Sequence, residues 1–173
     1  FTANWVPDYD FHADKPDDLF RPWGFQPGHQ VEWARLLLTL DSIQSEPWYL
    51  PRAKSLYEIC MKLGRDPKFG GIYYGYAPDG TVCAPSKYYW VHSETIATTW
   101  RLFQRTKDQK YRDDYENLWR YSWDHFVDHD YGAWYRILSR EGIKRDSQKS
   151  PPGKTDYHTV GVVWDILDNL EQL

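Results

Sequence analysis

The amino-acid sequence predicts an all-α fold of helical pairs, with short β-hairpins in the loops that join them. Five segments carry apolar residues at the spacing of a helix, and two segments between them combine turn signals with aromatic residues. The order is two helices, a hairpin loop, two helices, a second hairpin loop and a final helix, without a repeat of fixed period. A chain of 173 residues suits one domain, so we predict a single domain over 1–173.

The first part of the chain contains a loop and two helices. Residues 1–28 show no steady period and are rich in proline, aspartate and aromatic residues, which predicts an extended loop. A helix begins near His29, and its apolar face is formed by Val31, Ala34, Leu37 and Leu38. A second helix runs from about Pro51, a residue suited to a first turn, to Gly64.

The middle of the chain contains a hairpin and a second pair of helices. Aromatic residues alternate over 70–82, and an Asp-Gly pair within this segment supplies the turn, so we predict a short hairpin here. Helices are then predicted from about Trp90 to Arg105 and from about Gln109 to His129.

The last part of the chain contains a second hairpin, a loop and a final helix. The hairpin is predicted over 134–142, where Gly142 completes the turn. Residues 144–155 are charged and contain proline, which is typical of a surface loop. The final helix is predicted from about Tyr157 to the end of the chain.

Composition limits the classes of function. Asp and Glu total 25 and Lys and Arg total 21, so the net charge of −4 argues against nucleic acid as the main partner. No apolar run approaches the roughly 20 residues of a membrane helix, so no membrane partner is predicted. The 10 Trp and 14 Tyr suit burial and also stacking on sugar rings.

The cysteines and the first residue bear on localisation. Cys60 and Cys83 fit neither a disulfide framework nor a zinc ribbon, which favours a reducing compartment, so we expect the cytoplasm. The chain begins with Phe1 in mid-pattern, so we expect its true start to lie upstream and draw nothing from the lack of a signal peptide.

The first candidate site lies at the start of the first helix. His29, Glu32 and Trp33 share one face at helical spacing, and the helix dipole disfavours an imidazolium in the first turn. A neutral imidazole beside a carboxylate can act as a general base near neutral pH. The alternative is a structural His–Glu pair.

A second histidine lies at the start of the final helix. Thr155 or Asp156 can cap this helix, which places His158 in its first turn. An exposed histidine next to a simple cap is the alternative. If the helices of His29 and His158 are parallel neighbours in a ring, both imidazoles flank one cavity.

Three further features could contribute to a site. Trp90 and Glu94 lie four residues apart and offer a stacking platform beside a hydrogen-bond acceptor, although core packing explains Trp90 equally well. Trp134 lies in a loop-forming segment and suits either a pocket or loop packing. His125 and His129 have the spacing of a metal pair but lack a convincing third ligand, so we predict no metal site.

Three motifs together resemble the N-acylglucosamine 2-epimerase superfamily. They are the segments 21–33, 90–94 and 154–159, and the most specific part is the Pro-Gly-His-x-x-Glu-Trp string that contains His29. The Lys-Thr-Asp-Tyr-His-Thr string at 154–159 is most similar to the aldose–ketose isomerase branch that acts on mannose or sulfoquinovose. The resemblance covers essentially the whole chain.

The resemblance implies a fold and a set of site residues. The fold is an (α/α)6 barrel, or α/α toroid, of inner and outer helices around a sugar pocket. The implied catalytic residues are His29 and His158 as an acid/base pair, with Glu32 as partner. The implied substrate-binding residues are Trp90, Glu94, Trp134 and Arg21.

The resemblance also implies a reaction on a monosaccharide substrate without cofactor or metal. A free hexose of the mannose type is converted to its 2-ketose through a cis-enediol(ate), with His158 moving the proton between C1 and C2 and His29 opening the ring. A 2-epimerase of the N-acylglucosamine or cellobiose type is the close alternative. A glycoside hydrolase and a noncatalytic carbohydrate-binding domain are more distant ones.

The family pattern further implies that the chain is incomplete. A complete member has about twice this length and twelve barrel helices, and the five predicted here match its C-terminal half. We therefore expect exposed apolar faces, and either a homo-oligomer or association with a missing N-terminal half.

Overall fold

The computed structural model describes residues 18, 23–150 and 157–170. Within these residues the chain forms five α-helices, a π-helical turn and four short strands, which confirms the predicted all-α fold with hairpins. The helices are α1 (Pro27–Ile43), α2 (Tyr49–Ile59), continued by the π-helical turn η1 (Cys60–Gly64), α3 (Tyr89–Thr106), α4 (Gln109–His125) and α5 (Tyr157–Leu170). The strands are β1 (Gly75–Tyr76), β2 (Val82–Ala84), β3 (Lys87–Tyr88) and β4 (Ile137–Leu138).

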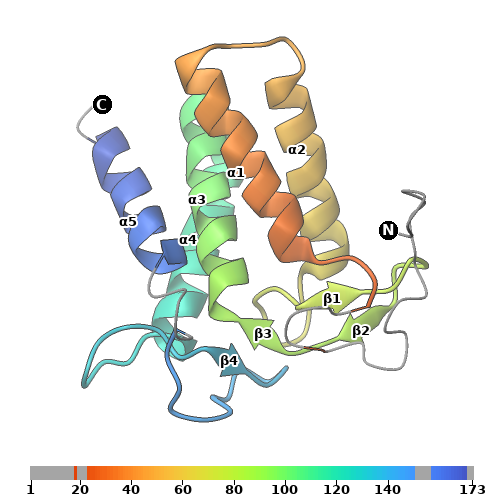
Figure 1. Cartoon of the computed structure of the whole chain (residues 1–173), viewed down its shortest axis with the longest axis vertical. Helices are drawn as coiled ribbons and strands as arrows, with labels where there is room; N and C mark the ends of the chain where they lie inside the picture. The colour runs from red at the N-terminus through yellow and green to blue at the C-terminus, as the bar shows by residue number, and fades with distance from the viewer. Residues whose placement is uncertain (1–17, 19–22, 151–156, 171–173) are drawn as a thin grey trace, which may run out of the picture.

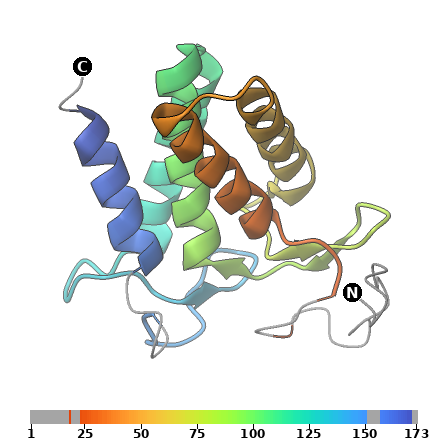
Figure 2. The same cartoon turned by 45° about the horizontal axis from the view of Figure 1, so that its top comes forward.

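Three parallel helices form one row. α3 packs against α1 on one side and against α5 on the other, while α2 packs on α1 and α4 packs on α3 (Figure 1). α1, α3 and α5 all begin at the end of the molecule that carries the strands, and α2 and α4 run in the opposite direction (Figures 1 and 2). The N-termini of the three parallel helices therefore open on the same face.

α3 is the central helix, and almost all of it is buried although its sequence is rich in threonine. Its buried hydroxyls donate to backbone carbonyls: Thr95 donates to Val91 (2.6 Å), and Thr99 donates to Ile96 (2.7 Å). The Thr98 hydroxyl lies 2.8 Å from the carbonyl of Val31 on α1. These bonds satisfy the polar groups, so small polar residues can fill a helix that packs closely on both neighbours.

The strands close the end of the bundle where the parallel helices begin. β1 and β2 form the predicted antiparallel hairpin, and Gly80 takes a φ of +87° in its turn. β3 pairs antiparallel with β4, with Lys87 opposite Leu138. The predicted second hairpin is present only as an isolated bridge between Leu138 and Lys144, because β4 has its main partner in β3, far earlier in the sequence.

Several predicted boundaries differ from the structure. α1 begins at Pro27 and α2 at Tyr49, each two residues before the predicted start. α4 ends at His125 and not at His129, because Asp128 accepts hydrogen bonds from the backbone amides of Asp130 and Tyr131 and turns the chain.

Other predicted segments agree with the structure or lie beyond what it describes. The final helix begins at Tyr157 as predicted, and 144–150 contain no helix or strand. Most of the predicted N-terminal loop, and the segment 151–156, lie outside the described residues.

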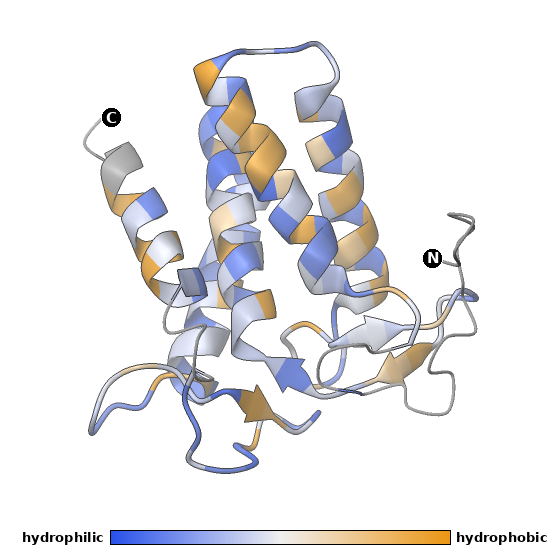
Figure 3. Cartoon of the chain, in the orientation of Figure 1, coloured by the Kyte–Doolittle hydropathy of each residue, from blue (hydrophilic) through white to orange (hydrophobic). Residues whose placement is uncertain are grey.

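Two helices expose apolar side chains to solvent. They are Trp33, Leu36, Leu40 and Ile43 on α1, and Val160, Val163, Trp164 and Leu167 on α5. Figure 3 shows that apolar residues continue along both helices. No helix in the described part of the chain is long and apolar enough to cross a membrane.

Candidate functional site

The sequence motifs meet where the three parallel helices begin. His29 lies in the first turn of α1, Trp90 and Glu94 lie in the first two turns of α3, and His158 lies in the first turn of α5. The two histidine-bearing helices are parallel to each other but not adjacent, because the buried helix α3 packs between them. The three helix starts nevertheless bring His29, Trp90, Glu94 and His158 together, through the ring contacts of Trp90 and the bond between His158 and Glu94.

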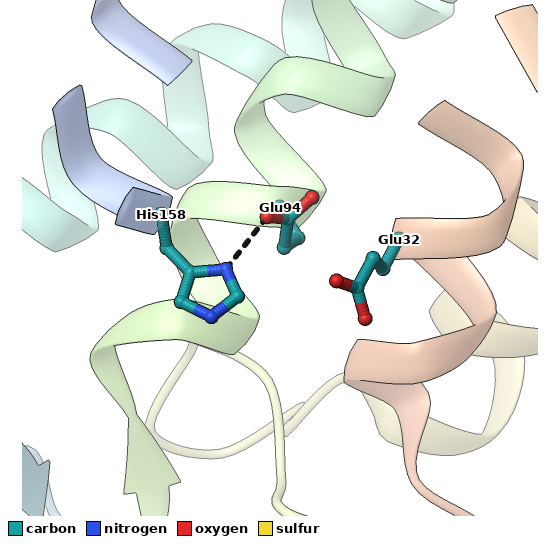
Figure 4. A group of neighbouring side chains, drawn as sticks. All are labelled: Glu32, Glu94 and His158. Carbon is teal, nitrogen blue, oxygen red and sulfur yellow. Dashed lines mark hydrogen bonds and ion pairs between the residues drawn. The ribbon is translucent and has the colours of Figure 1, made fainter. Parts of the chain in front are cut away.

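His158 and Glu94 form a buried hydrogen-bonded pair. His158 Nδ1 lies 2.8 Å from Glu94 Oε1, and the exposed fractions are 7% for His158 and 0% for Glu94 (Figure 4). A carboxylate can only accept, so the ring proton of a neutral imidazole lies on Nδ1 and the lone pair remains on Nε2. This geometry gives His158 a defined tautomer with a basic atom on the opposite edge of the ring.

Arg35 is a member of this site that the sequence analysis missed. Its Nε donates to Glu94 Oε2 (2.6 Å) and its Nη2 donates to Glu94 Oε1 (3.3 Å). Burial works against the charge of Arg35, but Glu94, Asp165 and Tyr157 together outweigh it and raise the pKa of the guanidinium. One feature of the sequence could have indicated Arg35: it is a cationic residue one helical turn after Glu32, immediately before the apolar run that begins at Leu36.

Glu32 extends from α1 towards the His158–Glu94 pair (Figure 4). One ligand atom of each of Glu32, Glu94 and His158 lies within 4.8 Å of the others. The Glu32 carboxylate is thus directed to the second histidine, His158. Its predicted role as the partner of His29 stays a prediction.

Trp90 links the two histidines. Its indole lies 5.2 Å from the His29 ring and 5.5 Å from the His158 ring, measured between ring centroids. Gly28 makes this approach possible, because a Cβ at that position would lie 2.4 Å from the Trp90 ring. His29 itself is exposed, so its ring lies at the open end of the helix row.

Glu32, Glu94 and His158 also have the spacing of a metal site. However, both Glu94 oxygens already accept hydrogen bonds from Arg35, and Oε1 also accepts one from His158. The guanidinium charge beside Glu94 opposes a second cation at the same carboxylate. The donor set therefore suits proton transfer better than metal binding.

The rings of His125 and His129, the other pair with metal-ligand spacing, bond to different backbone carbonyls. His125 Nδ1 lies 3.1 Å from the carbonyl of Gly142, and His129 Nε2 lies 3.0 Å from the carbonyl of Trp123. Each of these ring nitrogens donates to a carbonyl, so only the second nitrogen of each ring could bind an ion.

Trp134, a predicted substrate-binding residue, has ring contacts with residues other than the two histidines. The Trp134 ring packs against Phe126 (6.0 Å between centroids) and Trp119 (6.3 Å), so its contacts are those of loop packing. Its substrate role stays a prediction. Arg21 lies outside the described residues, as do Thr155 and Asp156, the predicted caps of α5.

Comparison with known proteins gives relatives along nearly the whole chain. Residues 1–162 match the family model of N-acylglucosamine 2-epimerase. The chain is 53% identical to the D-mannose isomerase of Marinomonas mediterranea, covering 98% of this chain and 43% of the relative. It is 34% identical to the D-mannose isomerase of Pseudomonas cannabina pv. alisalensis, covering 91% and 40% respectively.

A solved structure agrees with these relatives. A crystal structure of D-mannose isomerase superposes with a TM-score of 0.94 at 53% identity, covering 98% of this chain and 43% of that chain. The chain thus spans less than half the length of the relatives that it matches.

Proposed function

Because this chain belongs to the N-acylglucosamine 2-epimerase family, we propose that it forms part of an aldose–ketose isomerase that interconverts free mannose and fructose. The five helices are a part of the (α/α)6 toroid of this class. The observation that carries the proposal is the identity of 53% to a D-mannose isomerase over nearly the whole chain, which includes both histidine-bearing helix starts.

The proposed reaction moves protons and leaves the sugar's overall oxidation state unchanged. The pyranose first opens when a proton passes from O1 to the ring oxygen, a step that we assign to His29 at the exposed start of α1. His158 then removes the proton from C2, and the C2–H electron pair forms the double bond of a cis-enediol(ate). Return of the proton at C1, with transfer from O2 to O1, gives the ketose.

The geometry of His158 supports its part in this scheme. Its Nδ1 is bonded to Glu94, so Nε2 is the atom that would take the C2 proton. A buried carboxylate stabilises the imidazolium that forms in this step, as in other His–carboxylate pairs. The imidazole of His29 contacts the same Trp90 indole as His158 does. It would transfer protons to and from the oxygen atoms of the sugar.

Incubation with mannose in D2O tests the proposal. The expected product is fructose with deuterium at C1, whereas glucose would indicate a 2-epimerase. The test uses the chain alone and the chain mixed with the part of the Marinomonas relative that it does not match. Substitution His158→Gln is expected to abolish turnover. Cleavage of a disaccharide that survives His158→Ala would instead indicate a glycoside hydrolase, and sugar binding without turnover would indicate a binding domain.

We propose further that the remaining helices of the toroid cover the exposed apolar faces of α1 and α5. Both helices stand at the ends of the described row, and each presents large apolar side chains to solvent. Exposure of such contiguous surface is unfavourable and is typical of an interface. The partner would therefore be the complementary part of the ring, and a homo-oligomer is the other outcome of the test given below.

A further inference from the structure

We infer that Arg35 is a positioning residue of this site: it holds the Glu94 carboxylate so that His158 presents Nε2 to the sugar. This inference rests on the proposed function for its kinetic consequences. Its structural consequence, the tautomer of the His158 ring, can be measured without turnover.

The first support is the geometry at Glu94. This carboxylate is fully buried and comes from α3, whereas Arg35 reaches it from α1 and His158 from α5. Arg35 donates to both oxygens, and His158 shares Oε1 (2.8 Å). A guanidinium bound in this way fixes the plane of the carboxylate as well as its charge. The direction in which Oε1 faces His158 is therefore set by Arg35.

The second support is that Arg35 is itself held in place. Its Nη1 lies 3.9 Å from Asp165 Oδ2 on α5, and Arg101 on α3 donates through Nε to the same oxygen (2.7 Å). The ion pairs thus connect all three parallel helices. Because Arg35 contacts both Glu94 and Asp165, the packing of the three helices determines where its guanidinium lies against the Glu94 carboxylate.

The third support is the balance of charge around His158. Glu94 and Tyr89 on α3, Glu32 on α1 and Tyr157 on α5 lie beside the His158 ring. Arg35 is linked to the ring through Glu94, and His29 through Trp90. Asp165 and Arg101 lie beyond Arg35 in the same series of ion pairs. Among the described residues, Arg35 is the cation in direct contact with Glu94.

Loss of Arg35 has a definite consequence for the ring. Without the guanidinium, the plane of the Glu94 carboxylate is no longer fixed, so the His158 proton is held less firmly on Nδ1. Because Nε2 is the proposed base, we expect kcat to fall.

Three substitutions and one control test the inference. Arg35→Met is expected to lower kcat tenfold or more and to change KM little, because the substitution disturbs the base and not the sugar contacts. Arg35→Lys restores the positive charge but not the two parallel N–H donors of the guanidinium, so kcat recovers only in part. Arg35→Gln gives the same test as Arg35→Met if the latter does not fold.

The control is Arg101→Met. Arg101 and Arg35 have the same side-chain exposure of 13% and both face Asp165, but the ion pair of Arg101 is with Asp165 and not with Glu94. We expect this variant to lose stability and to keep the His158 proton on Nδ1. Equal changes of the His158 tautomer in the Arg35 and Arg101 variants would mean that the effect is one of general packing, and the inference would be wrong.

Nitrogen NMR of the His158 ring separates this inference from the proposed function. In the neutral ring of the unsubstituted chain, the expected spectrum shows a protonated Nδ1 and an unprotonated Nε2, and Arg35→Met or Arg35→Gln should mix the two forms. This readout holds even if no sugar is turned over. An unchanged tautomer in the Arg35 variants would overturn the inference.

Discussion

At the scale of single residues, Glu94 is the carboxylate that binds both the proposed base His158 and the buried cation Arg35. It is a carboxylate with no solvent exposure, and its hydrogen bonds to Arg35 and His158 offset the large free energy needed to bury a charge. It sits one turn after Trp90, the ring shared by both histidines.

Substitution Glu94→Gln tests the role of this charge. The amide has nearly the same shape but can present its NH2 to His158, which would reverse the tautomer of the ring. In a comparable His–carboxylate pair, the amide substitution lowers kcat by about 10⁴, so we expect a loss of about 10²- to 10⁴-fold in mannose turnover. Glu116→Gln is the control, because Glu116 is an exposed residue on α4. Similar losses in both variants would contradict the assigned role.

His92 supplies a second residue-scale prediction, which concerns stability. It is fully buried, its Nδ1–H donates to the Tyr88 carbonyl, and its Nε2 accepts from the amide of Ile72. Burial lowers the pKa of His92 to about 3, compared with about 6.5 in the unfolded chain.

Because the unfolded chain binds this proton more readily, the stability due to neutral His92 is complete above about pH 6.5 and is lost as the pH falls towards 3. The expected slope is about 1.4 kcal/mol per pH unit in that window. Urea unfolding at several pH values measures it, with His92→Gln as the variant that lacks the titration. A slope that is the same in both proteins would contradict the prediction.

At the scale of elements, the approach of α1 to α3 depends on Gly28. The residue precedes His29 and packs directly on the Trp90 ring, so a side chain there must displace either the indole or the helix start. This contact holds the first turn of α1 at the site.

Substitution Gly28→Ala is therefore expected to lower stability by about 1–3 kcal/mol through overpacking, and to reduce mannose turnover because His29 and Trp90 move apart. Gly161→Ala in α5 is a matched control. No atom lies within 4 Å of the added Cβ, so alanine should raise stability by about 0.5–1 kcal/mol through helix propensity. Thermal unfolding and mannose turnover of the two variants provide the comparison.

A buried ion pair fixes the strands beneath the helices. Lys87 of β3 lies 3.5 Å from Asp66, and both side chains have no solvent exposure. Burial disfavours the charge of Asp66, but hydrogen bonds from Arg140 and from the amides of Lys68 and Phe69 outweigh it and hold the pKa of Asp66 at about 2.

Substitution Asp66→Asn leaves the Lys87 ammonium buried without its counter-charge. We expect a loss of about 3–5 kcal/mol, which is typical when one partner of a buried pair is removed. Asp113→Asn on the exposed side of α4 is the control, and denaturant unfolding is the measurement. A loss below about 1 kcal/mol for Asp66→Asn would show that the pair is not needed.

At the scale of the whole molecule, the row of helices ends in two apolar faces. Trp164 on α5 is 70% exposed and Leu40 on α1 is 47% exposed, although both belong to strongly apolar helices. The chain also spans less than half of each relative, so these faces correspond to surfaces that further helices can cover.

We expect the chain alone to self-associate and to bind a hydrophobic dye, and both effects should fall when the unmatched part of the Marinomonas relative is added. The double variant Leu40→Glu/Trp164→Glu should abolish the association, whereas Tyr131→Glu, at an exposed loop position, should not. Sedimentation velocity measures the outcome. If the chain is monomeric and does not bind the added part, the proposed partner is wrong. If the chain forms a closed dimer that does not bind the added part, a homo-oligomer is favoured.

Much of this molecule could be predicted from the sequence because the signals are local. Apolar spacing located all five helices to within a few residues at most ends, and the Asp-Gly pair located the first hairpin, since both depend on neighbouring residues. The positions of His29 and His158 in first helix turns were likewise a local consequence of where each helix begins.

Features that depend on packing became visible only in the tertiary structure. β4 pairs with β3 rather than within its own hairpin, α3 lies between the two histidine-bearing helices, and Arg35 joins Glu94 across 59 residues of sequence. No local pattern carries these facts, because they follow from which surfaces of separate helices are buried against each other. The sequence by itself determined the helices and the chemistry that each one carries. The buried packing of α1, α3 and α5 decided which of those groups meet, namely Arg35 with Glu94 as an ion pair and Glu94 with His158 as a hydrogen-bonded pair.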